Sequence, residues 1–309
     1  MKLLGPFGAD RRVGFVGLGV MGAGMAHCLL RKGFPLQVHV RNPAAAQPIV
    51  AAGATVAASP AELGGNCTLV FLSLPDAAAV EEVLFGPQGL ADGLAPGSCV
   101  VDTSTIAATS ARALGERLRE RGVWFMDAPV SGGQQGAMDG VLSCMVGGAP
   151  ELFAACREAL GSFCKTITHV GPLGAGQTVK ACNQVAVAGA LLGVAEAIAL
   201  AKAQGVDPAL MRDVLLGGAA RSFSLEKHGP RIISGDFKPG FRARLMRKDL
   251  RLALDTAQGS GTVLPTAVLA EKLLDDACEA GRAEWDWCAL ALQVQLMSGL
   301  PLPAAPAPS

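Results

Sequence analysis

Short apolar runs alternate with helical patterns along the first half of the chain. The runs cover residues 12–16, 36–40, 68–74, 98–102 and 123–126, and turn residues bound each of them, which is typical of buried strands. The segments between the runs carry helical patterns. Because strands that alternate with helices form βαβ units, this pattern predicts a parallel sheet.

The pattern changes near residues 171–176. Beyond Gly176 the chain has long helical stretches and few strand-like runs. Asp207 and Pro208 supply the N-cap and first residue of one such helix. We therefore expect the second half of the chain to be all-helical.

The length agrees with this division. At roughly 100–200 residues per domain, 309 residues predict about two domains. We expect an α/β chain in which a doubly wound parallel sheet over residues 11–173 precedes an all-helical domain over residues 174–300. The Pro/Ala-rich residues 301–309 are expected to form a disordered tail.

The most apolar segment, residues 185–201, is expected to be a core helix and not a membrane span. It contains Glu196, and two polar residues precede it directly. We interpret it as a helix that is buried on nearly all sides within the protein. Gly189 and Gly193 lie four residues apart on it and would permit a close approach of a second helix. The first ten residues are too short and too interrupted by Gly and Pro for a signal peptide.

Composition excludes several classes of function. Half of the residues are hydrophobic, so the chain is expected to fold around a sizeable core. Lys plus Arg and Asp plus Glu are 26 each, a balance that argues against binding to nucleic acid or to an anionic membrane. Tyrosine is absent, which excludes a tyrosine acid. The apolar helical domain predicts burial against a second subunit, as a homodimer or homotetramer.

The nine cysteines are scattered, and none forms a C-x-x-C pair. This spacing argues against a structural metal site, and we expect no metal. Cysteines without a disulfide framework are expected to stay reduced, which indicates a cytoplasmic protein.

A glycine-rich turn follows the first predicted strand and opens a helix. This context predicts a Rossmann-type dinucleotide site, in which the first glycine makes the turn, the second admits the pyrophosphate and the third allows the helix to pack on the strand. The helix N-terminus would supply N–H groups to the phosphates. The candidate cofactor-binding residues of the turn are Gly17, Leu18, Gly19, Val20, Met21 and Gly22.

The second predicted strand ends without a carboxylate. Val40, Arg41, Asn42 and Pro43 stand where an Asp or Glu would bind the ribose hydroxyl of NAD. The planar fork of Arg41 suits a 2′-phosphate, so the sequence predicts NADP(H). The alternative is that Arg41 is only a solvated turn residue.

A second glycine-rich turn follows the strand at residues 123–126. Gly132 and Gly133 would expose backbone N–H groups to an anion, with the hydroxyl of Ser131 as a further donor. A substrate carboxylate would fit there. The alternative is a plain glycine turn.

Lys180 is the candidate acid. It lies near the start of the long apolar helix and shares a face with Asn183, three residues on. The helix dipole, partial burial and a second cation would each lower the pKa of Lys180, and so suit it to proton transfer near neutral pH. The pattern alone fits an ordinary surface lysine as well. Its setting at the predicted domain junction, where α/β proteins bind ligands, favours the catalytic interpretation.

Taken together, these motifs resemble the β-hydroxyacid dehydrogenase family from Val13 to about Leu300. The matching segments are GFVGLGVMG, DAPVSGG, the GxGQxxKxxN pattern at residues 174–183 and KDL at residues 248–250. Within that family, RNP after the second strand and FKPGF at residues 237–241 are similar to the tartronate semialdehyde, glyoxylate and succinic semialdehyde reductases.

The resemblance implies roles for the matching positions. Lys180 would be the acid/base, Asn183 would orient the substrate, and Ser131 with Gly132 and Gly133 would hold its carboxylate. Lys248 would lie near the nicotinamide and ribose. Leu74, Pro75 and Thr105 match positions that line the cofactor cleft.

The expected activity is NADPH-dependent reduction of a short aldehydo-acid to the hydroxy acid. Three alternatives stay open: a 3-hydroxyisobutyrate dehydrogenase that uses NAD, an imine reductase, and a non-enzymatic NADP-binding scaffold. Imine reductases usually lack a lysine at the position of Lys180, and loss of that lysine would also accompany a scaffold role.

Overall fold

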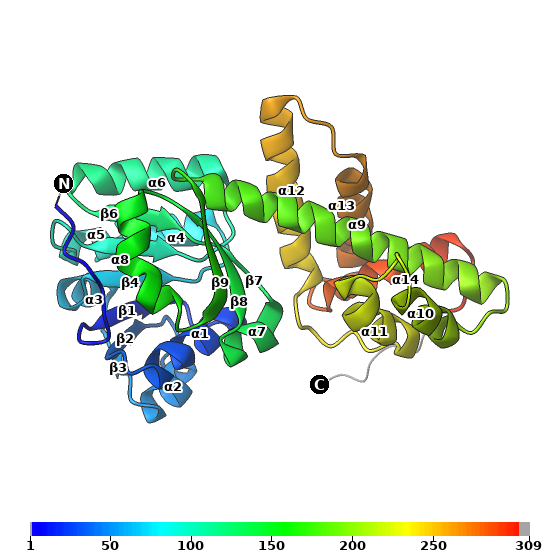
Figure 1. The fold of residues 1–309 in the computed structure, drawn as a ribbon, viewed down its shortest axis with the longest axis horizontal. Helices are drawn as coiled ribbons and strands as arrows, with labels where there is room; N and C mark the ends of the chain where they lie inside the picture. Colours follow the sequence, from blue (N-terminus) through cyan, green and yellow to red (C-terminus); the bar gives the residue numbers. More distant parts are fainter. Residues whose placement is uncertain (1, 303–309) are drawn as a thin grey trace. The chain divides into compact units, whose positions relative to one another are not determined.

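The computed structural model describes residues 2–302 (Figure 1). Its elements follow the predicted order of alternating strands and helices, then helices alone. Up to the middle of the chain they are β1 (Val13–Val16), α1 (Val20–Arg31), β2 (Leu36–His39), η1 (Pro43–Ala46), α2 (Gln47–Ala51), β3 (Thr55–Val56), α3 (Pro60–Asn66), β4 (Leu69–Leu72), α4 (Ala77–Phe85), α5 (Leu90–Gly93), β5 (Cys99–Asp102), α6 (Ala108–Glu120), β6 (Trp124–Asp127), β7 (Val130–Ser131), α7 (Gly133–Asp139), β8 (Leu142–Gly147), α8 (Pro150–Leu160) and β9 (Cys164–Gly171).

The remaining elements are helical. They are α9 (Ala175–Ala203), α10 (Pro208–Leu216), η2 (Ser224–His228), α11 (Gly229–Ser234), α12 (Ala243–Ser260), α13 (Pro265–Ala277), η3 (Cys278–Arg282), η4 (Trp287–Ala289) and α14 (Leu290–Met297). Chain contacts divide the protein into two units, with the division between Lys180 and Ala181 inside α9. Residues 303–309 of the predicted tail lie outside the described part of the chain.

The first unit is built on one nine-stranded sheet, in the order β3-β2-β1-β4-β5-β6-β8-β7, with β9 paired to β8. Strands β1 to β6 pair with one another in parallel, which confirms the parallel sheet predicted from five of them; β3 was not predicted. β8 runs antiparallel to β6 and β7. The sheet is thus doubly wound and mostly parallel.

Alternation along the strands places a core on each face of this sheet. In β4, Leu69 and Phe71 belong to one apolar cluster, together with side chains from α1 and α8. Val70 and Leu72 belong to another, together with side chains from α3, α4 and α6. All four residues are fully or almost fully buried. A strand buried on both faces reads as a continuous apolar run, which is why these strands are visible in the sequence.

The second unit packs its helices around a separate core. Leu191, Ile198, Leu250 and Leu274 are buried there. Asp207 caps α10 by accepting a hydrogen bond from the amide of Ala209, as predicted. Outside the sheet of the first unit, the described residues form one isolated β-bridge, between Arg242 and Asp286.

The expectation that α9 is buried on nearly all sides is wrong. The helix is long and apolar enough to cross a membrane by length and composition, which alone is weak evidence, and only half of its most apolar stretch is buried. Its exposed residues, among them Cys182, Gly193 and Leu200, recur at helical spacing and form one solvent-facing stripe. The mainly apolar composition conceals this amphipathic burial, because Ala and Gly are tolerated on either face.

Candidate active site

The first glycine-rich turn has the geometry of a dinucleotide site. Gly17 adopts a φ of +97°, and a Cβ there would lie 2.2 Å from the carbonyl oxygen of Ser73. A Cβ on Gly22 would lie 1.9 Å from the carbonyl oxygen of Gly17, so only glycine allows α1 to start this close to the strand. A Cβ on Gly19 would meet no atom within 4 Å.

The start of α1 is therefore open to a ligand. Its N-cap is Gly19, which offers no side-chain cap to the first N–H groups of the helix. Val20 is exposed, while Leu18 and Met21 are partly buried against the core. Unpaired N–H groups at an exposed helix N-terminus fit the pyrophosphate of a dinucleotide.

The other cofactor candidates come from the ends of neighbouring strands. Because β2, β1, β4 and β5 are adjacent and parallel, the residues that follow them meet at one edge of the sheet. Arg41 and Asn42 follow β2 and are exposed, and Asn42 accepts a hydrogen bond from the amide of Ala44. Leu74 and Pro75 follow β4, and Thr105 follows β5.

The loops after β4 and β5 are joined. The backbone amide of Leu74 donates to the hydroxyl of Ser104 over 2.8 Å. Ser104 in turn donates its amide to the buried carboxylate of Asp102, over 3.0 Å. The candidate cofactor edge is thus held by hydrogen bonds within the first unit.

The segment after β6 presents the second glycine-rich turn. Ser131 ends β7 and is half-buried, and Gly132 and Gly133 are exposed with φ values of +138° and +68°. Consecutive residues with positive φ expose their N–H groups, and a Cβ on Gly133 would meet no atom within 4 Å. The turn can accept an anion.

Lys180 lies next to this turn in space. It is 7% exposed, and its Nζ donates a hydrogen bond to the carbonyl oxygen of Val130 over 3.0 Å. Val130 directly precedes Ser131. The structure thus brings together the candidate acid and the candidate carboxylate turn, which are some 50 residues apart in the chain.

Asp127 was not predicted from the sequence; it is fully buried at the end of β6. Its two carboxylate oxygens accept the backbone N–H groups of Gly174 and Gln177 at 2.7 and 2.8 Å. Burial raises the pKa of Asp127, although these hydrogen bonds and the charge of Arg112 act in the opposite direction. Its place at the head of the DAPVSGG segment was the available signal.

Gln177 was also missed. Its side chain accepts the amide of Ile106 at 3.2 Å and donates to the carbonyl oxygen of Ser104 at 2.8 Å. These two residues flank Thr105, one of the candidate cofactor positions. Gln177 is the glutamine of the GxGQxxKxxN segment, and its place there was the available signal.

In the second unit, the candidates Asn183 and Lys248 are linked through Gln184 and Asp249, which were not predicted from the sequence. The Nδ2 of Asn183 donates to the Oε1 of Gln184 over 2.8 Å, and the Nε2 of Gln184 donates to Asp249 over 2.6 Å. The other oxygen of Asp249 forms an ion pair with the Nζ of Lys248 at 3.1 Å. Asp249 is 3% exposed, so these contacts satisfy a buried carboxylate.

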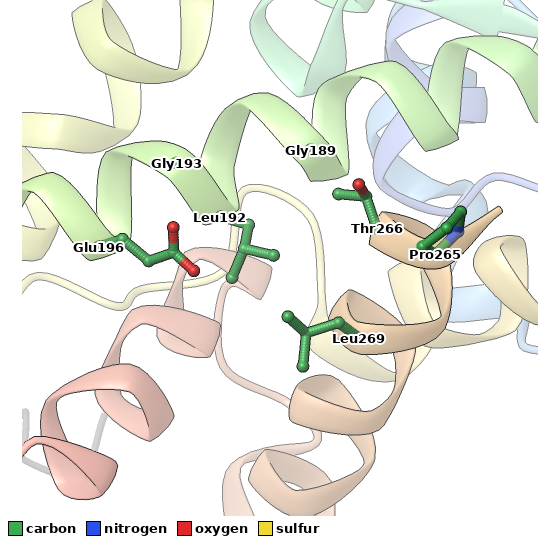
Figure 2. Close-up of a pocket in the computed structure, with 7 residues that line it drawn as sticks. All are labelled: Gly189, Leu192, Gly193, Glu196, Pro265, Thr266 and Leu269. Atoms are coloured by element: carbon green, nitrogen blue, oxygen red, sulfur yellow. The ribbon is translucent and has the colours of Figure 1, made fainter.

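A pocket in the second unit lies between α9 and α13 (Figure 2). Its lining residues are Gly189, Leu192, Gly193, Glu196, Pro265, Thr266 and Leu269. Figure 2 shows the side chains of Leu192 and Leu269 between the two helices. The only charge in this lining is negative, so the pocket does not suit a carboxylate substrate.

The close approach of a second helix that was predicted at Gly189 and Gly193 occurs at Gly189 alone. A Cβ on Gly189 would contact Thr266 at 3.3 Å, whereas one on Gly193 would meet no atom within 4 Å.

The fold and the candidate site together define the class of protein. A glycine turn open to a dinucleotide lies in the same unit as a buried lysine beside an anion-accepting turn. These are the parts of an oxidoreductase that uses a nicotinamide cofactor.

Comparison with known proteins gives the family. Residues 12–171 match the NAD-binding domain of 6-phosphogluconate dehydrogenase, and residues 174–294 match the family described as NAD-binding of NADP-dependent 3-hydroxyisobutyrate dehydrogenase. The chain belongs to the β-hydroxyacid dehydrogenase family. It is an oxidoreductase acting on CH–OH groups.

Three relatives illustrate the range of the family. The chain is 37% identical over 287 residues to 2-hydroxy-3-oxopropionate reductase of Escherichia coli, which covers 93% of this chain and 98% of that protein. It is 38% identical over 284 residues to NAD-dependent L-serine dehydrogenase of Pseudomonas aeruginosa, with coverages of 90% and 95%. The crystal structure of 3-hydroxyisobutyrate dehydrogenase from Salmonella typhimurium aligns with a TM-score of 0.84 at 34% identity, covering 92% of this chain and 99% of that one.

Proposed function

We propose that this enzyme reduces a short aldehydo-acid, of the tartronate, glyoxylate or succinic semialdehyde type, to the hydroxy acid with NADPH. The observation that carries the proposal is the contact of the Lys180 ammonium with Val130, directly beside the anion-accepting turn. A cation placed there can reach the carbonyl oxygen of a substrate whose carboxylate the turn holds. The name of the Escherichia coli relative, a 3-oxo-acid reductase, supports this substrate class.

Each candidate residue has a distinct task in this proposal. Ser131, Gly132 and Gly133 bind the carboxylate through the hydroxyl and the backbone N–H groups. Lys180 donates a proton to the carbonyl oxygen as negative charge develops there. In the reverse direction the neutral amine removes the hydroxyl proton. Asn183 orients the substrate by hydrogen bonding, and when the cofactor is bound its nicotinamide supplies or accepts the hydride.

We propose NADP(H) rather than NAD(H) as the cofactor. The turn formed by residues 17–22 fits a pyrophosphate, and Lys248 would contribute beside the nicotinamide and ribose. Arg41 is exposed after β2, where it is free of neighbouring acidic side chains in the chain sequence and suits a 2′-phosphate. The Pseudomonas aeruginosa relative is named as NAD-dependent, so cofactor choice varies within the family.

Lys180→Ala tests the mechanism. The variant should lose nearly all turnover, because the proton donor is gone, and should bind NADPH almost as tightly as the wild type. Steady-state rates with glyoxylate and with tartronate, succinic and methylmalonate semialdehydes, each with NADPH and NADH, provide the measurement. Turnover close to that of the wild type would remove Lys180 from the mechanism.

The same panel, extended to 3-hydroxyisobutyrate and to cyclic imines, decides between the alternatives. Preference for NADH with the oxidation of 3-hydroxyisobutyrate would identify the NAD-dependent branch. Reduction of cyclic imines but not of aldehydo-acids would identify an imine reductase, and NADPH binding without oxidation by any compound would identify a scaffold.

Arg41→Ala tests the choice of cofactor. Loss of a charge-assisted contact with the 2′-phosphate is worth about 1.5–3 kcal/mol, so the Kd for NADPH should rise about 10- to 150-fold. The Kd for NADH should stay unchanged, because NADH has no such phosphate. An equal effect on both cofactors would refute the assigned role.

We also propose a cytoplasmic homodimer or homotetramer assembled through the helical unit. All nine cysteines are free thiols, which suits a reducing compartment. Leu200, Leu210 and Val214 are 64%, 62% and 68% exposed, and a second copy of the chain would cover such side chains. Light scattering coupled to size exclusion should give an oligomer for the wild type and a smaller species for Leu200→Glu. A monomeric wild type would refute the proposal.

A further inference from the structure

Asp127 caps the helix that carries Lys180. The first N–H groups of a helix have no partner inside it and need an acceptor from elsewhere. Here the carboxylate of Asp127 accepts two N–H groups at the start of α9, from Gly174 and from Gln177. Caps are normally local, whereas this one comes from the end of β6, 47 and 50 residues earlier in the chain.

The first turn of α9 lies directly against the sheet at this point. A Cβ on Gly176 would lie 2.4 Å from the carbonyl oxygen of Met145 and 2.8 Å from Oδ2 of Asp127. Even one methyl group would therefore push α9 away from the strands. This approach makes the position of the helix sensitive to small changes at its cap.

Gln177 makes a second attachment on the other side. Its buried side chain binds the backbone on both sides of Thr105, through Ser104 and Ile106. The loop after β5 and the first turn of α9 are thereby joined by two hydrogen bonds. Gln177 and Lys180 are three residues apart, so they project from the same face of the helix.

From this arrangement we propose that Asp127 and Gln177 are positioning residues that place the Lys180 ammonium beside the substrate carboxylate turn. Asp127 fixes the start of α9 to the strand that leads into the turn, and Gln177 fixes it to the loop that lines the cofactor edge. Their described side-chain hydrogen bonds are with backbone groups, so we assign to each an effect on the position of Lys180 and no contact with the substrate. The inference rests on the proposed function of Lys180.

Two variants remove one attachment each. Asp127→Asn keeps one oxygen acceptor but turns an amide N–H₂ toward the other backbone N–H. Gln177→Met keeps the approximate length of the side chain but makes neither hydrogen bond. Because a displacement of about 1 Å in a reacting group costs up to about 100-fold in rate, each variant should lower kcat about 10- to 100-fold with little change in KM.

The pH profile separates positioning from simple loss of stability. Asp127→Asn removes a buried carboxylate from the start of the helix that carries Lys180. Loss of a negative charge there disfavours the protonated form of the amine. The midpoint of the pH dependence of kcat should therefore move to lower pH. Gln177→Met, which removes no charge, should lower kcat with a smaller displacement of the midpoint.

Leu160→Ala is the matched control, since Leu160 is fully buried in α8 and contacts none of the proposed catalytic groups through a hydrogen bond. It should lower the melting temperature while keeping kcat and the pH midpoint of the wild type. The inference is overturned if Asp127→Asn and Gln177→Met, measured well below their melting temperatures, behave as Leu160→Ala does.

A measurement that does not depend on catalytic turnover distinguishes a failure of this inference from a failure of the proposed function. Acylation of Lys180 by acetic anhydride, followed by mass spectrometry across a pH series, reports the reactivity of its amine directly. A displaced profile in Asp127→Asn supports the positioning role even if Lys180→Ala proves active, in which case the proposed function alone fails. A profile identical to that of the wild type refutes the positioning role.

Discussion

Gly19→Ala should separate cofactor binding from folding. The backbone of Gly19 has φ −72° and ψ −170°, which alanine adopts without strain, and its added Cβ would meet no protein atom within 4 Å. Since Gly19 is the N-cap of α1, where alanine is less favourable, the free energy of unfolding should fall by only about 0.5–1 kcal/mol.

The effect on binding should be larger. A pyrophosphate that receives backbone N–H groups at this turn would meet the new methyl group. The loss of one hydrogen bond to a charged group is about 1.5–3 kcal/mol, which corresponds to an increase of about 10- to 150-fold in the Kd for NADPH. Isothermal titration calorimetry gives the Kd, and urea denaturation gives the free energy of unfolding.

Two further glycines provide the controls. Gly17→Ala should destabilise the protein by more than about 2 kcal/mol, because φ is +97° and the Cβ would lie 2.2 Å from the Ser73 carbonyl oxygen. Gly193→Ala, at an open position inside α9, should raise stability by up to about 1 kcal/mol and leave the Kd unchanged. If folded Gly19→Ala binds NADPH within twofold of the wild type, the reasoning about this turn is refuted.

Three other changes follow from the structure. Asp249→Ala should lower stability by about 3 kcal/mol, since it leaves the buried amide of Gln184 without its carboxylate partner; a double-mutant cycle with Gln184→Ala should show non-additive costs in urea denaturation. Burial lowers the pKa of His228 below its usual 6.5, so the unfolded chain binds protons more readily and stability should fall as pH decreases through 6.5; His228→Gln should weaken that dependence in melting curves recorded from pH 8 to 5. Phe163→Ala should cost about 3–5 kcal/mol, because Phe163 is fully buried with its ring 5.4 Å from that of Phe71, and a cost below 1 kcal/mol would show that the core refills the space.

The pattern of the chain predicted the parallel strands and the first glycine turn. A strand such as β4 is buried on both faces, so its apolar run is visible without knowledge of its neighbours. The turn was equally visible, because the positive φ of Gly17 and the close approach at Gly22 require glycine.

The additional strands were not predicted. Only Cys164 of β9 is buried, and Lys165 and Thr166 follow it, so the apolar signal of this strand is weak. β7 and β3 have two residues each, which is too short for any period to appear. Such strands exist because neighbouring strands satisfy their backbone groups, and that pairing is not encoded in a local pattern.

The sequence by itself determined five buried parallel strands, the helical second half, the open turn at Gly19 and the identity of the candidate acid, because periodicity and backbone freedom are properties of neighbouring residues. Only the tertiary structure decided that Asp127 and Gln177 hold the helix of Lys180, and that Gln184 and Asp249 join Asn183 to Lys248. The contacts of Asp127 and Gln177, and that between Gln184 and Asp249, join groups about 50 or more residues apart in the chain. The free energy that selects them comes from burial and hydrogen bonding after the chain has folded.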